Sequence, residues 1–572
     1  MNRKWQLATK PDQQFIEKFP GIPPLILQLM HNRGLITQAA INEFFNPNYS
    51  QGLHSPWLFN DMVKAVKEIM AAIDRKEKIT IYGDYDADGL GGTVILAETL
   101  EALGADLDIY IPHREKEGYG LNSEAVKAIA NNNTKLIITV DCGITNLAEV
   151  VLANSLGLNV IITDHHQPAL ASPEALAIIN PNAIGEKYPF KDLAGAGVAF
   201  KLVQALGLAD QKKSKLLPLG FEKWLLDLVA IATVADMVSL LGENRILVSY
   251  GLVVLNKTRR LGLQVLISEI GLTGQITTQQ MGFQLGPRLN AAGRLNHANV
   301  VYKLLTANSK KEAAILAQEL NRANQERQRL TEQIINEIKK ELGEIKPEQP
   351  VIFAVGNNWP VGVVGLVAGK LCDEYYRPTF VLTSLSGEIK GSGRSIPDFN
   401  ITKALGEVND LLSHFGGHTQ ACGLTLKSPE ALAEFKRRIA EVAERELADK
   451  DLNPALVIDA ETELKAIDWA VYSQLEKLEP FGEDNPKPIM AAYNLEVFNI
   501  QPVGQDDKHL RLFLKDDSGK VHKTIGFCFG DWCQRLKAGD HVDIVFEADA
   551  NQWNGSRELQ FKIVDLRINE NG

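Results

Sequence analysis

The sequence predicts an α/β protein with a parallel-sheet domain, a long helix that joins it to a second α/β domain, and a C-terminal β-barrel. Three observations support this fold class. Short β-rich runs alternate with helical stretches between residues 78 and 163, which implies a parallel sheet. Apolar residues recur at helical spacing from Ser309 to Leu342, and the residues from 453 onward combine short strands and turns with little helix.

The first α/β region contains four expected strands with helices between them. The strands are Lys78–Tyr82, Asp106–Ile111, Leu136–Val140 and Val160–Thr163, and the helices are Thr93–Leu103, Ser123–Asn131 and Leu147–Leu156. Ligands of such sheets bind beyond the carboxyl ends of the strands. Three strands run directly into polar clusters there: GDYDADG at 83–89, DCG at 141–143 and DHH at 164–166.

Five segments are expected along the chain. They are an N-terminal segment 1–55, the first α/β domain 56–308, the long helix 309–343, a second α/β domain 344–452 with a strand at Val351–Val355, and a barrel 453–572. Ser309 and Glu312 form a capping-box pattern at the start of the long helix. Its length is typical of a helix that bridges two domains.

Composition is that of a globular protein, with 45% hydrophobic and 23% charged residues. The net charge of −11 argues against a surface that is basic everywhere, but a local groove can still be positive. Five cysteines without CxxC spacing predict reduced thiols rather than disulfides or a zinc site. Since we find neither a targeting segment nor an apolar run long enough to span a bilayer, we expect a cytoplasmic protein without membrane partners.

Asp84, Asp86 and Asp88 alternate on a glycine-flanked stretch, so their carboxylates can converge on a small cation. An EF-hand is the first alternative, but its twelfth position would be Ile95 where a bidentate Glu is needed, and the stretch follows a strand. A purely structural Asp-rich turn is the second, although three crowded carboxylates are costly without a cation.

Asp141 and the pair His165–His166 add a carboxylate and two imidazoles at the same sheet edge. Each alone is weak evidence, because an Asp after a strand is usually a helix cap and a single His is usually surface or core. Their coincidence at successive strand ends is stronger. Mixed Asp and His ligands suit Mn²⁺ or Mg²⁺, and two such ions are the usual means of phosphodiester hydrolysis.

The motifs GDYDADG, TVDCG at 139–143, TDHHQ at 163–167 and VADMVSL at 234–240 resemble, in order and spacing, those of the DHH phosphoesterase superfamily. The match narrows to the RecJ exonucleases, which combine DHH, DHHA1 and OB-like domains. It does so through PHREKEGYGLN at 112–122, DLAGAGVAFKL at 192–202, GPRLNAAGR at 286–294, GSGRS at 391–395, GGHTQACG at 416–423 and PFGEDNPKP at 480–488.

The resemblance implies a set of functional residues. The implied ligands of two divalent ions, Mn²⁺ or Mg²⁺, are Asp84, Asp86, Asp88, Asp141, His165 and Asp236. Only the resemblance selects Asp236, which lies in an apolar helical stretch. His166 is the implied proton-handling residue, and Asp164 would orient an imidazole.

The implied substrate-binding residues are Arg114, Tyr119, Arg288, Ser392, Arg394, His418 and Trp553. Without the resemblance, each arginine would more readily be assigned to a surface ion pair. Lys508, His509, Arg511, Trp532, Trp553 and Arg557 give the barrel the bases and aromatics that stack unpaired bases, although a Trp in a barrel is as often core. GLVAGK at 365–370 and GAGVAF at 195–200 do not complete nucleotide-binding loops, so no ATP is implied.

The expected function is therefore a 5′-to-3′ exonuclease that is specific for single-stranded DNA with a free 5′ end, releases 5′-mononucleotides and acts in DNA repair and recombination. The resemblance suggests a single-stranded-DNA-binding protein and a DNA helicase as partners. The alternatives are a DHH-family phosphodiesterase of short oligonucleotides and a non-catalytic DNA-binding scaffold. The chain departs from the family pattern at Gly91 and Gly92, where a polar residue is usual, at Pro360, where a His is common, and at Asp484, where a Gly is usual.

Overall fold

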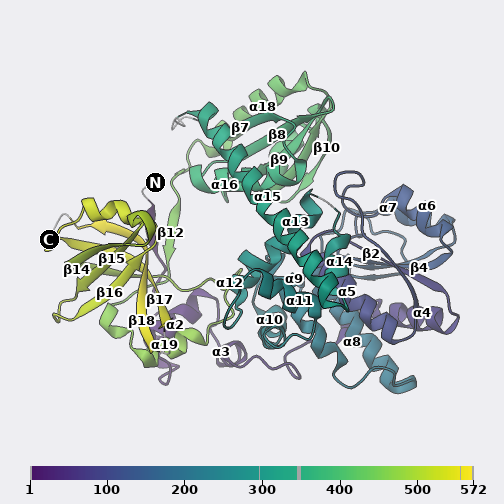
Figure 1. Ribbon diagram of the computed structural model, residues 1–572, viewed down its shortest axis with the longest axis horizontal. Helices are drawn as coiled ribbons and strands as arrows, with labels where there is room; N and C mark the ends of the chain where they lie inside the picture. Colours follow the sequence, from purple (N-terminus) through teal and green to yellow (C-terminus); the bar gives the residue numbers. More distant parts are fainter. Residues whose placement is uncertain (1–2, 296, 344–348, 554–555, 570–572) are drawn as a thin grey trace. The chain divides into compact units, whose positions relative to one another are not determined.

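The structure is a computed structural model that describes residues 3–295, 297–343, 349–553 and 556–569 (Figure 1). The chain forms two compact units. One contains residues 53–238 and 246–453, and the other contains 1–52, 239–245 and 454–572. Among the described helices, none has both the length and the apolar character needed to cross a membrane.

The first unit begins with the predicted parallel sheet, whose strand order is β3-β2-β4-β5-β6. Its strands are β2 (Lys78–Gly83), β3 (Asp106–Tyr110), β4 (Thr134–Val140), β5 (Asn159–Thr163) and β6 (Ala177–Ile179). Its helices are α4 (Met62–Asp74), α5 (Ala87–Ala102), α6 (Ser123–Asn131), α7 (Leu147–Ser155), α8 (Gly195–Lys213) and α9 (Leu226–Ala235). The central strands are buried on both faces, as their continuous apolar runs indicate.

Helix α5 starts at Ala87, six residues before the predicted start at Thr93. Asp86 is its N-cap and Asp88 lies in its first turn, so the expected glycine-flanked loop is wrong for this part of the motif. Glycine suits positions 91 and 92 because other parts of the chain pack closely against them. A Cβ on Gly91 would lie 3.3 Å from Ala232, and one on Gly92 would lie 2.6 Å from Val140. A side chain at position 92 would clash with Val140, and one at position 91 would require Ala232 to shift slightly.

The long helix α15 (Lys310–Leu342) confirms the predicted helix to within one residue at its start. It contacts α11 (Leu261–Glu269), α13 (Gly286–Leu295) and α14 (Asn299–Leu305), and farther along it contacts α16 (Val361–Tyr375), so it links the two sheets of this unit (Figure 1). Ser309 is its N-cap, but the Ser309 side chain accepts no hydrogen bond, so the predicted capping box is wrong.

The second sheet has the order β10-β11-β9-β8-β7. Only β7 and β8 are parallel, and the other neighbours are antiparallel. Its strands are β7 (Ile352–Asn357), β8 (Thr379–Leu385), β9 (Glu388–Arg394), β10 (Leu412–Gly417) and β11 (Ala421–Leu426), with helices α16, α17 (Ile401–Glu407) and α18 (Ala431–Leu447). Gly391 and Gly393 of β9 face close neighbours on the buried side, which turns Ser392 and Arg394 to the other side.

The second unit contains the predicted closed barrel. Its strands follow the order β14-β15-β16-β18-β17, and β14 also pairs with β17. They are β14 (Met490–Val503), β15 (His509–Lys515), β16 (Val521–Gly526), β17 (His541–Trp553) and β18 (Ser556–Ile568). In β15, Leu510, Leu512 and Leu514 point into the core, so the residues between them face outward.

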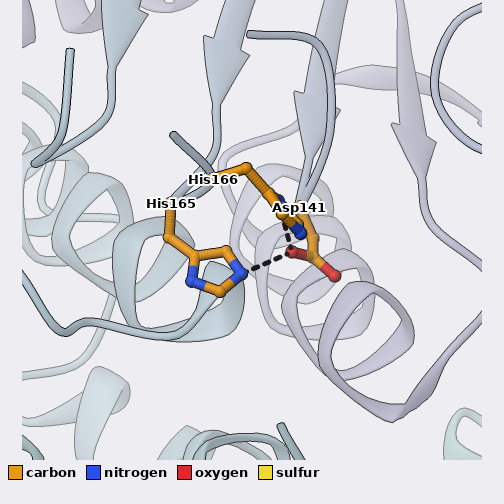
Figure 2. Close-up of side chains that lie close together, drawn as sticks. All are labelled: Asp141, His165 and His166. Atoms are coloured by element: carbon orange, nitrogen blue, oxygen red, sulfur yellow. Dashed lines mark ion pairs between the residues drawn. The ribbon is translucent and has the colours of Figure 1, made fainter. Parts of the chain in front are cut away.

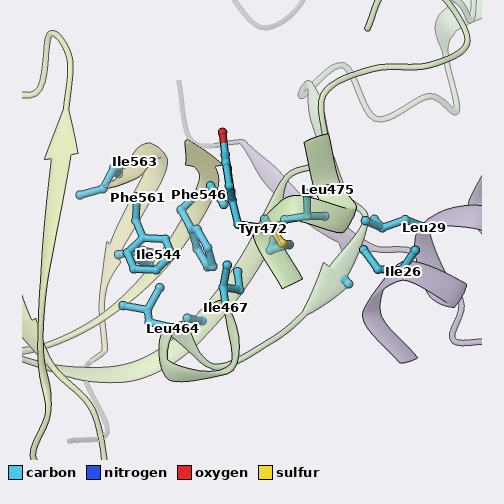
Figure 3. Packing of buried hydrophobic residues seen from close by; sticks show 14 of the residues in the cluster. Ile26, Leu29, Leu464, Ile467, Tyr472, Leu475, Ile544, Phe546, Phe561 and Ile563 are labelled. Carbon is cyan, nitrogen blue, oxygen red and sulfur yellow. The ribbon is translucent and has the colours of Figure 1, made fainter. Parts of the chain in front are cut away.

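The N-terminal residues share the core of the barrel unit. Strand β1 (Lys4–Leu7) pairs in parallel with β12 (Ala455–Ile458). Ile26 and Leu29 of helix α2 (Pro24–Asn32) lie in one apolar cluster with Tyr472 and Leu475 of α19 (Trp469–Glu476) and with barrel residues (Figure 3). Segments from both ends of the chain therefore form one folding unit.

Arg245 joins three separate segments of this unit. It is 3% exposed, and its guanidinium lies 3.6 Å from the centre of the Phe44 ring. It donates hydrogen bonds to the backbone carbonyl oxygens of Phe44 (2.8 Å), Lys477 (3.1 Å), Leu478 (3.0 Å) and Glu479 (2.7 Å). One rigid, multidentate donor thus satisfies four acceptors at once.

We predict that Arg245→Ala lowers the free energy of unfolding of the barrel unit by about 3 kcal/mol or more, because buried carbonyls lose a charged donor. Denaturant unfolding followed by barrel tryptophan fluorescence measures this change. Arg535→Ala, which removes an exposed arginine of the same unit, is the control and is expected to cost much less. Equal losses in the two variants would show that Arg245 contributes no more than a surface charge.

Candidate metal centre

The carboxyl ends of β2 and β4 carry the first two acidic clusters. Asp84 follows β2, and its backbone N–H donates to the Val140 carbonyl (3.2 Å). A Cβ on Gly89 would lie 2.7 Å from the Asp84 side chain, so Gly89 allows the first turn of α5 to approach Asp84. The Asp86 side chain accepts hydrogen bonds from the backbone of Asp88 (2.9 Å) and Gly89 (3.0 Å), which fixes the start of α5.

Asp88 is held by the N-terminus of α8. Its two carboxylate oxygens accept hydrogen bonds from the N–H groups of Gly195 (2.6 Å) and Ala196 (2.8 Å). A helix N-terminus favours a negative charge at this position. Gly195 also packs against Asp141, where an added Cβ would lie 2.6 Å from the Asp141 Cβ. The same turn of α8 therefore positions both carboxylates.

His165 lies among three carboxylates that come from different elements. Its Nε2 is 3.2 Å from Asp141 Oδ1, 3.7 Å from Asp236 Oδ2 and 3.9 Å from Asp88 Oδ2 (Figure 2 shows the Asp141 contact). Asp236 is the C-cap of α9. Since Nε2 has no hydrogen-bond partner, the hydrogen bond that His165 makes with the Leu193 backbone belongs to Nδ1. The Nε2 atom is thus available as a ligand.

The free cluster is electrostatically unfavourable. Burial, and after it the charges of neighbouring carboxylates, raises the pKa values of Asp84, Asp141 and Asp236 well above their ordinary range and that of Asp88 to about 7. Burial lowers the pKa of His165 to about 4. Asp84 Oδ1, Asp141 Oδ1 and His165 Nε2 are buried without a hydrogen-bond partner. A set of crowded carboxylates and one neutral imidazole is suited to bind divalent cations. Such cations would stabilise the charged form of the carboxylates in place of protons.

The possible ligands form overlapping groups whose donor atoms lie within 4.8 Å of one another. The groups are Asp84, Asp86 and Asp141; Asp88, His165 and Asp236; and Asp141, His165 and His166. The first two groups together contain the six metal ligands that the sequence predicts. Two neighbouring ions, one for each group, fit this arrangement.

His166 is held differently from His165. Its Nδ1 lies 2.8 Å from Asp164 Oδ1 and 3.0 Å from the Tyr119 hydroxyl, which itself donates to the Asp141 carbonyl (2.9 Å). Burial disfavours a charged His166, but the contact with Asp164 raises its pKa. Although burial opposes it, the His166 hydrogen bond keeps the pKa of Asp164 low. Because a carboxylate only accepts, Nδ1 carries a proton, and in the neutral ring Nε2 is the nitrogen that can accept one.

A cavity of about 320 Å³ opens over the cluster. Of the predicted substrate residues, Arg114 and Tyr119 line it. His166 and four of the five predicted carboxylate ligands also line it: Asp84, Asp86, Asp141 and Asp236. The Arg114 guanidinium lies 5.0 Å from the centre of the Tyr85 ring. The cavity thus has carboxylates on its floor and a guanidinium on its wall, and a guanidinium is a group that can bind a phosphate.

The sequence analysis missed five residues that line this cavity: Tyr85, Ala235, Met237, Asn290 and Arg294. The Asn290 side chain accepts a hydrogen bond from the Ala87 N–H (2.7 Å) and so supports the start of α5. Asn290 and Arg294 are four residues apart on α13 and share one face, whereas the predicted Arg288 is not in the cavity lining. The i, i+4 spacing was the signal that could have identified them.

Arg288, Ser392, Arg394 and His418 lie outside the cavity lining. Ser392 and Arg394 lie together, since a Cβ on Gly365 would be 3.3 Å from Ser392 Oγ and 3.1 Å from Arg394 Nη2. Burial lowers the pKa of Arg394, and the charge of Arg114 contributes, which indicates that the two guanidinium groups are near each other. His418 is exposed in the turn between β10 and β11.

The barrel candidates have different environments. His509 and Arg511 lie on the outward side of β15, and Arg511 Nε has no hydrogen-bond partner. Trp532 is partly buried against the barrel core under Arg535, as the alternative reading of a core tryptophan allows. Arg557 pairs with Glu476 and stacks on Trp469. The side chain of Trp553 lies outside the described ones.

Two departures from the family pattern have a structural explanation. Asp484 adopts a left-handed backbone conformation with φ of 56°, which explains why glycine is usual there and why Asp is tolerated. Pro360 is the N-cap of α16, where its fixed φ fits the helix start.

Comparison with known families gives three matches in the same order as the predicted regions. The DHH family N-terminal domain matches residues 78–233, the DHHA1 domain matches 348–445, and the RecJ OB domain matches 458–565.

Several relatives carry the name single-stranded-DNA-specific exonuclease RecJ. The Bacillus subtilis protein is 38% identical over 99% of this chain and 71% of its own length, and the Escherichia coli protein is 32% identical over 99% and 100%. A crystal structure of RecJ from Thermus thermophilus in complex with Mn²⁺ matches with a TM-score of 0.83 and 30% identity, covering 99% of this chain and 80% of that one. A Mg²⁺ complex of that protein matches with a TM-score of 0.76 and 28% identity, over 99% and 79%. The chain therefore belongs to the RecJ family of exonucleases.

Proposed function

We propose that this chain is a metal-dependent exonuclease that degrades single-stranded DNA from a free 5′ end and releases 5′-mononucleotides. The observation that carries the proposal is the buried Asp/His cluster at the carboxyl ends of β2, β4 and β5, in a chain of the RecJ family. The names of the relatives state their preference for single-stranded DNA. The direction of digestion and a role in DNA repair and recombination follow from the family.

Asp84, Asp86, Asp88, Asp141, His165 and Asp236 would hold two divalent ions, Mn²⁺ or Mg²⁺. When bound, such ions stabilise the negative charge that develops on the scissile phosphate. The α8 N-terminus keeps Asp88 in place and Gly195 keeps Asp141 close to it, so the protein holds the ligands in position before the ions arrive.

His166 and Asp164 are the proposed catalytic pair. The Asp164 carboxylate holds the Nδ1 proton of His166, and the free Nε2 can take the proton of the attacking water. The water oxygen forms a bond to phosphorus, and the bond between phosphorus and the 3′ oxygen of the terminal nucleotide breaks. The 3′ oxygen leaves with the mononucleotide and takes up a proton from solvent to become a hydroxyl. The shortened strand retains a 5′-phosphate and is again a substrate.

Arg114, Ser392 and Arg394 are proposed to bind the terminal 5′-phosphate, with Tyr119, Arg288 and His418 as further contacts to the strand. The nearness of Arg114 to Arg394 supports this assignment, because two guanidinium groups without a shared carboxylate suit a dianion. The outward side of β15 is proposed to bind unpaired bases, with Arg511 as a candidate contact.

The remaining assignments are also proposals. We infer a cytoplasmic protein with an N-terminal segment 1–55 and the further domain limits 56–308, 309–343, 344–452 and 453–572. A helicase and a single-stranded-DNA-binding protein would supply and present the substrate, because an enzyme that admits one strand depends on duplex opening.

We predict that Asp141→Ala reduces hydrolysis of single-stranded DNA at least about 100-fold and weakens Mn²⁺ binding, because it removes a carboxylate from the ligand cluster. The melting temperature without metal should not fall, since one of several repelling buried carboxylates is removed. Nuclease assays, calorimetry with Mn²⁺ and thermal melting measure these effects. Asp106→Ala, at the other end of the same sheet, is the control; wild-type turnover by Asp141→Ala would contradict the metal assignment.

We predict that Arg394→Ala loses most of the preference for 5′-phosphorylated over 5′-hydroxyl ends, by about 1.5–3 kcal/mol for a charge-assisted contact. Mn²⁺ affinity should be unchanged. The measurement is kcat/KM on both end types, with Arg437→Ala on the exposed face of α18 as the matched control. An unchanged preference would remove Arg394 from the pocket, and digestion from the 3′ end would overturn the proposed polarity. Faster digestion of very short oligonucleotides than of long strands would favour the alternative phosphodiesterase.

A further inference from the structure

Arg114 and Tyr119, which line the metal cavity, belong to the connection 111–122 between β3 and α6. The His113 carbonyl accepts a hydrogen bond from the Glu117 N–H (2.8 Å), which closes a turn that contains Arg114. Tyr119 follows this turn by two residues. The way in which the turn is fixed therefore decides where the Arg114 side chain lies.

The side chain of Glu117 closes the same turn a second time. Its Oε2 accepts a hydrogen bond from the His113 N–H (2.6 Å), so the two residues are joined through both backbone and side chain. Its Oε1 accepts from the Tyr110 hydroxyl (2.6 Å) and from the Asn122 amide (3.2 Å). Tyr110 is the last residue of β3, and Asn122 is the N-cap of α6. One carboxylate thus ties the turn to both elements that it connects.

The Glu117 carboxylate is held in its charged form. Burial opposes that form, but hydrogen bonds from Tyr110, His113 and Asn122 outweigh it and lower the pKa of Glu117. In the described part of the chain, no ion pair joins Glu117 to Arg114, whose guanidinium lies 5.0 Å from the centre of an aromatic ring in the cavity wall. Glu117 therefore fixes the backbone of the turn without neutralising its arginine.

The part of the connection after the turn is anchored without Glu117. The Gly120 carbonyl accepts a hydrogen bond from the Tyr82 hydroxyl (2.8 Å). The Asn146 side chain accepts from the Leu121 N–H (3.2 Å) and donates to the Leu121 carbonyl (3.0 Å). Tyr119 lies next to these anchors in the chain. Loss of the carboxylate should therefore release the turn with the arginine more than it releases the tyrosine.

We propose that Glu117 is a positioning residue, which holds the turn so that the Arg114 guanidinium is placed to bind a phosphate in the cavity. Glu117 itself is not among the residues that line the cavity, so it acts through Arg114. The inference rests on the proposed binding of the terminal 5′-phosphate by Arg114. Because a displacement of about 1 Å costs a well-placed group much of its effect, loss of this hold should weaken phosphate binding and leave metal binding unchanged.

The test is a double-mutant cycle of Glu117→Ala and Arg114→Ala, measured as kcat and KM on 5′-phosphorylated and 5′-hydroxyl strands. For Glu117→Ala we expect the preference for the 5′-phosphate to fall about tenfold through KM, with kcat and Mn²⁺ affinity unchanged. In the Arg114→Ala background, Glu117→Ala should cause no further loss of preference. Glu115→Ala, which removes a carboxylate from an exposed position in the same turn, is the matched control.

Two conservative variants separate positioning from general stability. The Glu117→Gln side chain can still accept from the His113 N–H while its amide donates to the Tyr110 hydroxyl, so it should retain most of the preference. Tyr110→Phe keeps the ring stacked on Tyr82 but removes one anchor, so an intermediate loss is expected even if Glu117→Ala folds poorly. An unchanged preference in Glu117→Ala, or an equal loss in the presence and absence of Arg114, would overturn the inference.

Hydrogen exchange distinguishes this inference from the proposed function. The His113 amide should exchange faster in Glu117→Ala than in the wild type, whereas the amides of β2 and β4 should exchange equally in both. Unchanged exchange at His113 would overturn the inference, whatever the enzyme hydrolyses. A wild type without preference for a 5′-phosphate would overturn the proposed phosphate pocket, and the exchange at His113 would still decide whether Glu117 holds the turn.

Discussion

The carboxylate of Asp88 accepts hydrogen bonds from two N–H groups at the start of α8, and the geometry of the metal centre depends on this contact. It joins α5 to α8, and through Gly195 it brings Asp141 against the same helix turn. The N–H groups offset part of the charge of Asp88, but burial and the neighbouring Asp86 still raise its pKa to about 7. The backbone donors thus hold the Asp88 carboxylate in position but do not fully compensate the cost of its buried charge.

The parallel sheet was predictable because β2, β4 and β5 are largely apolar runs and an Asp follows each of them. β2, β4 and β5 begin and end close to the predicted residues, and Asp84, Asp141 and Asp164 follow them at one edge. The start of α5 was not predictable in this way. Glycine disfavours helices by about 1 kcal/mol, so a stretch with Gly89, Gly91 and Gly92 suggests a loop. Packing against Val140 and Ala232 outweighs that preference, and no local pattern reports it.

Other parts of the fold and of the site could not be predicted because they depend on contacts between segments that are distant in the sequence. The apolar spacing of α2 shows that Ile26 and Leu29 are buried, but not that residues of α19 cover them. Removing the chain from residue 453 onward would therefore expose the N-terminal helices as well as delete the barrel. In the metal cavity, motif matching selected Arg288, whereas helical spacing would have selected Asn290 and Arg294. The alternation in β9 predicts that Ser392 and Arg394 share a face, and the structure places them together beside Gly365.

The total charge of −11 does not show that acidic and basic side chains lie on different sides of the metal cavity in the first unit. The floor of the cavity holds carboxyl groups whose pKa values are raised by burial and then by the charges of neighbouring carboxylates. Its wall holds Arg294, whose pKa is lowered by burial and then by neighbouring arginines. A phosphodiester in the cavity without divalent ions would be repelled by the floor, so attraction by the arginines alone is insufficient. Divalent cations would neutralise the carboxylates on the floor, and a polyanion would neutralise the arginines on the wall. Metal binding and strand binding should therefore favour one another, although no single residue belongs to both sites.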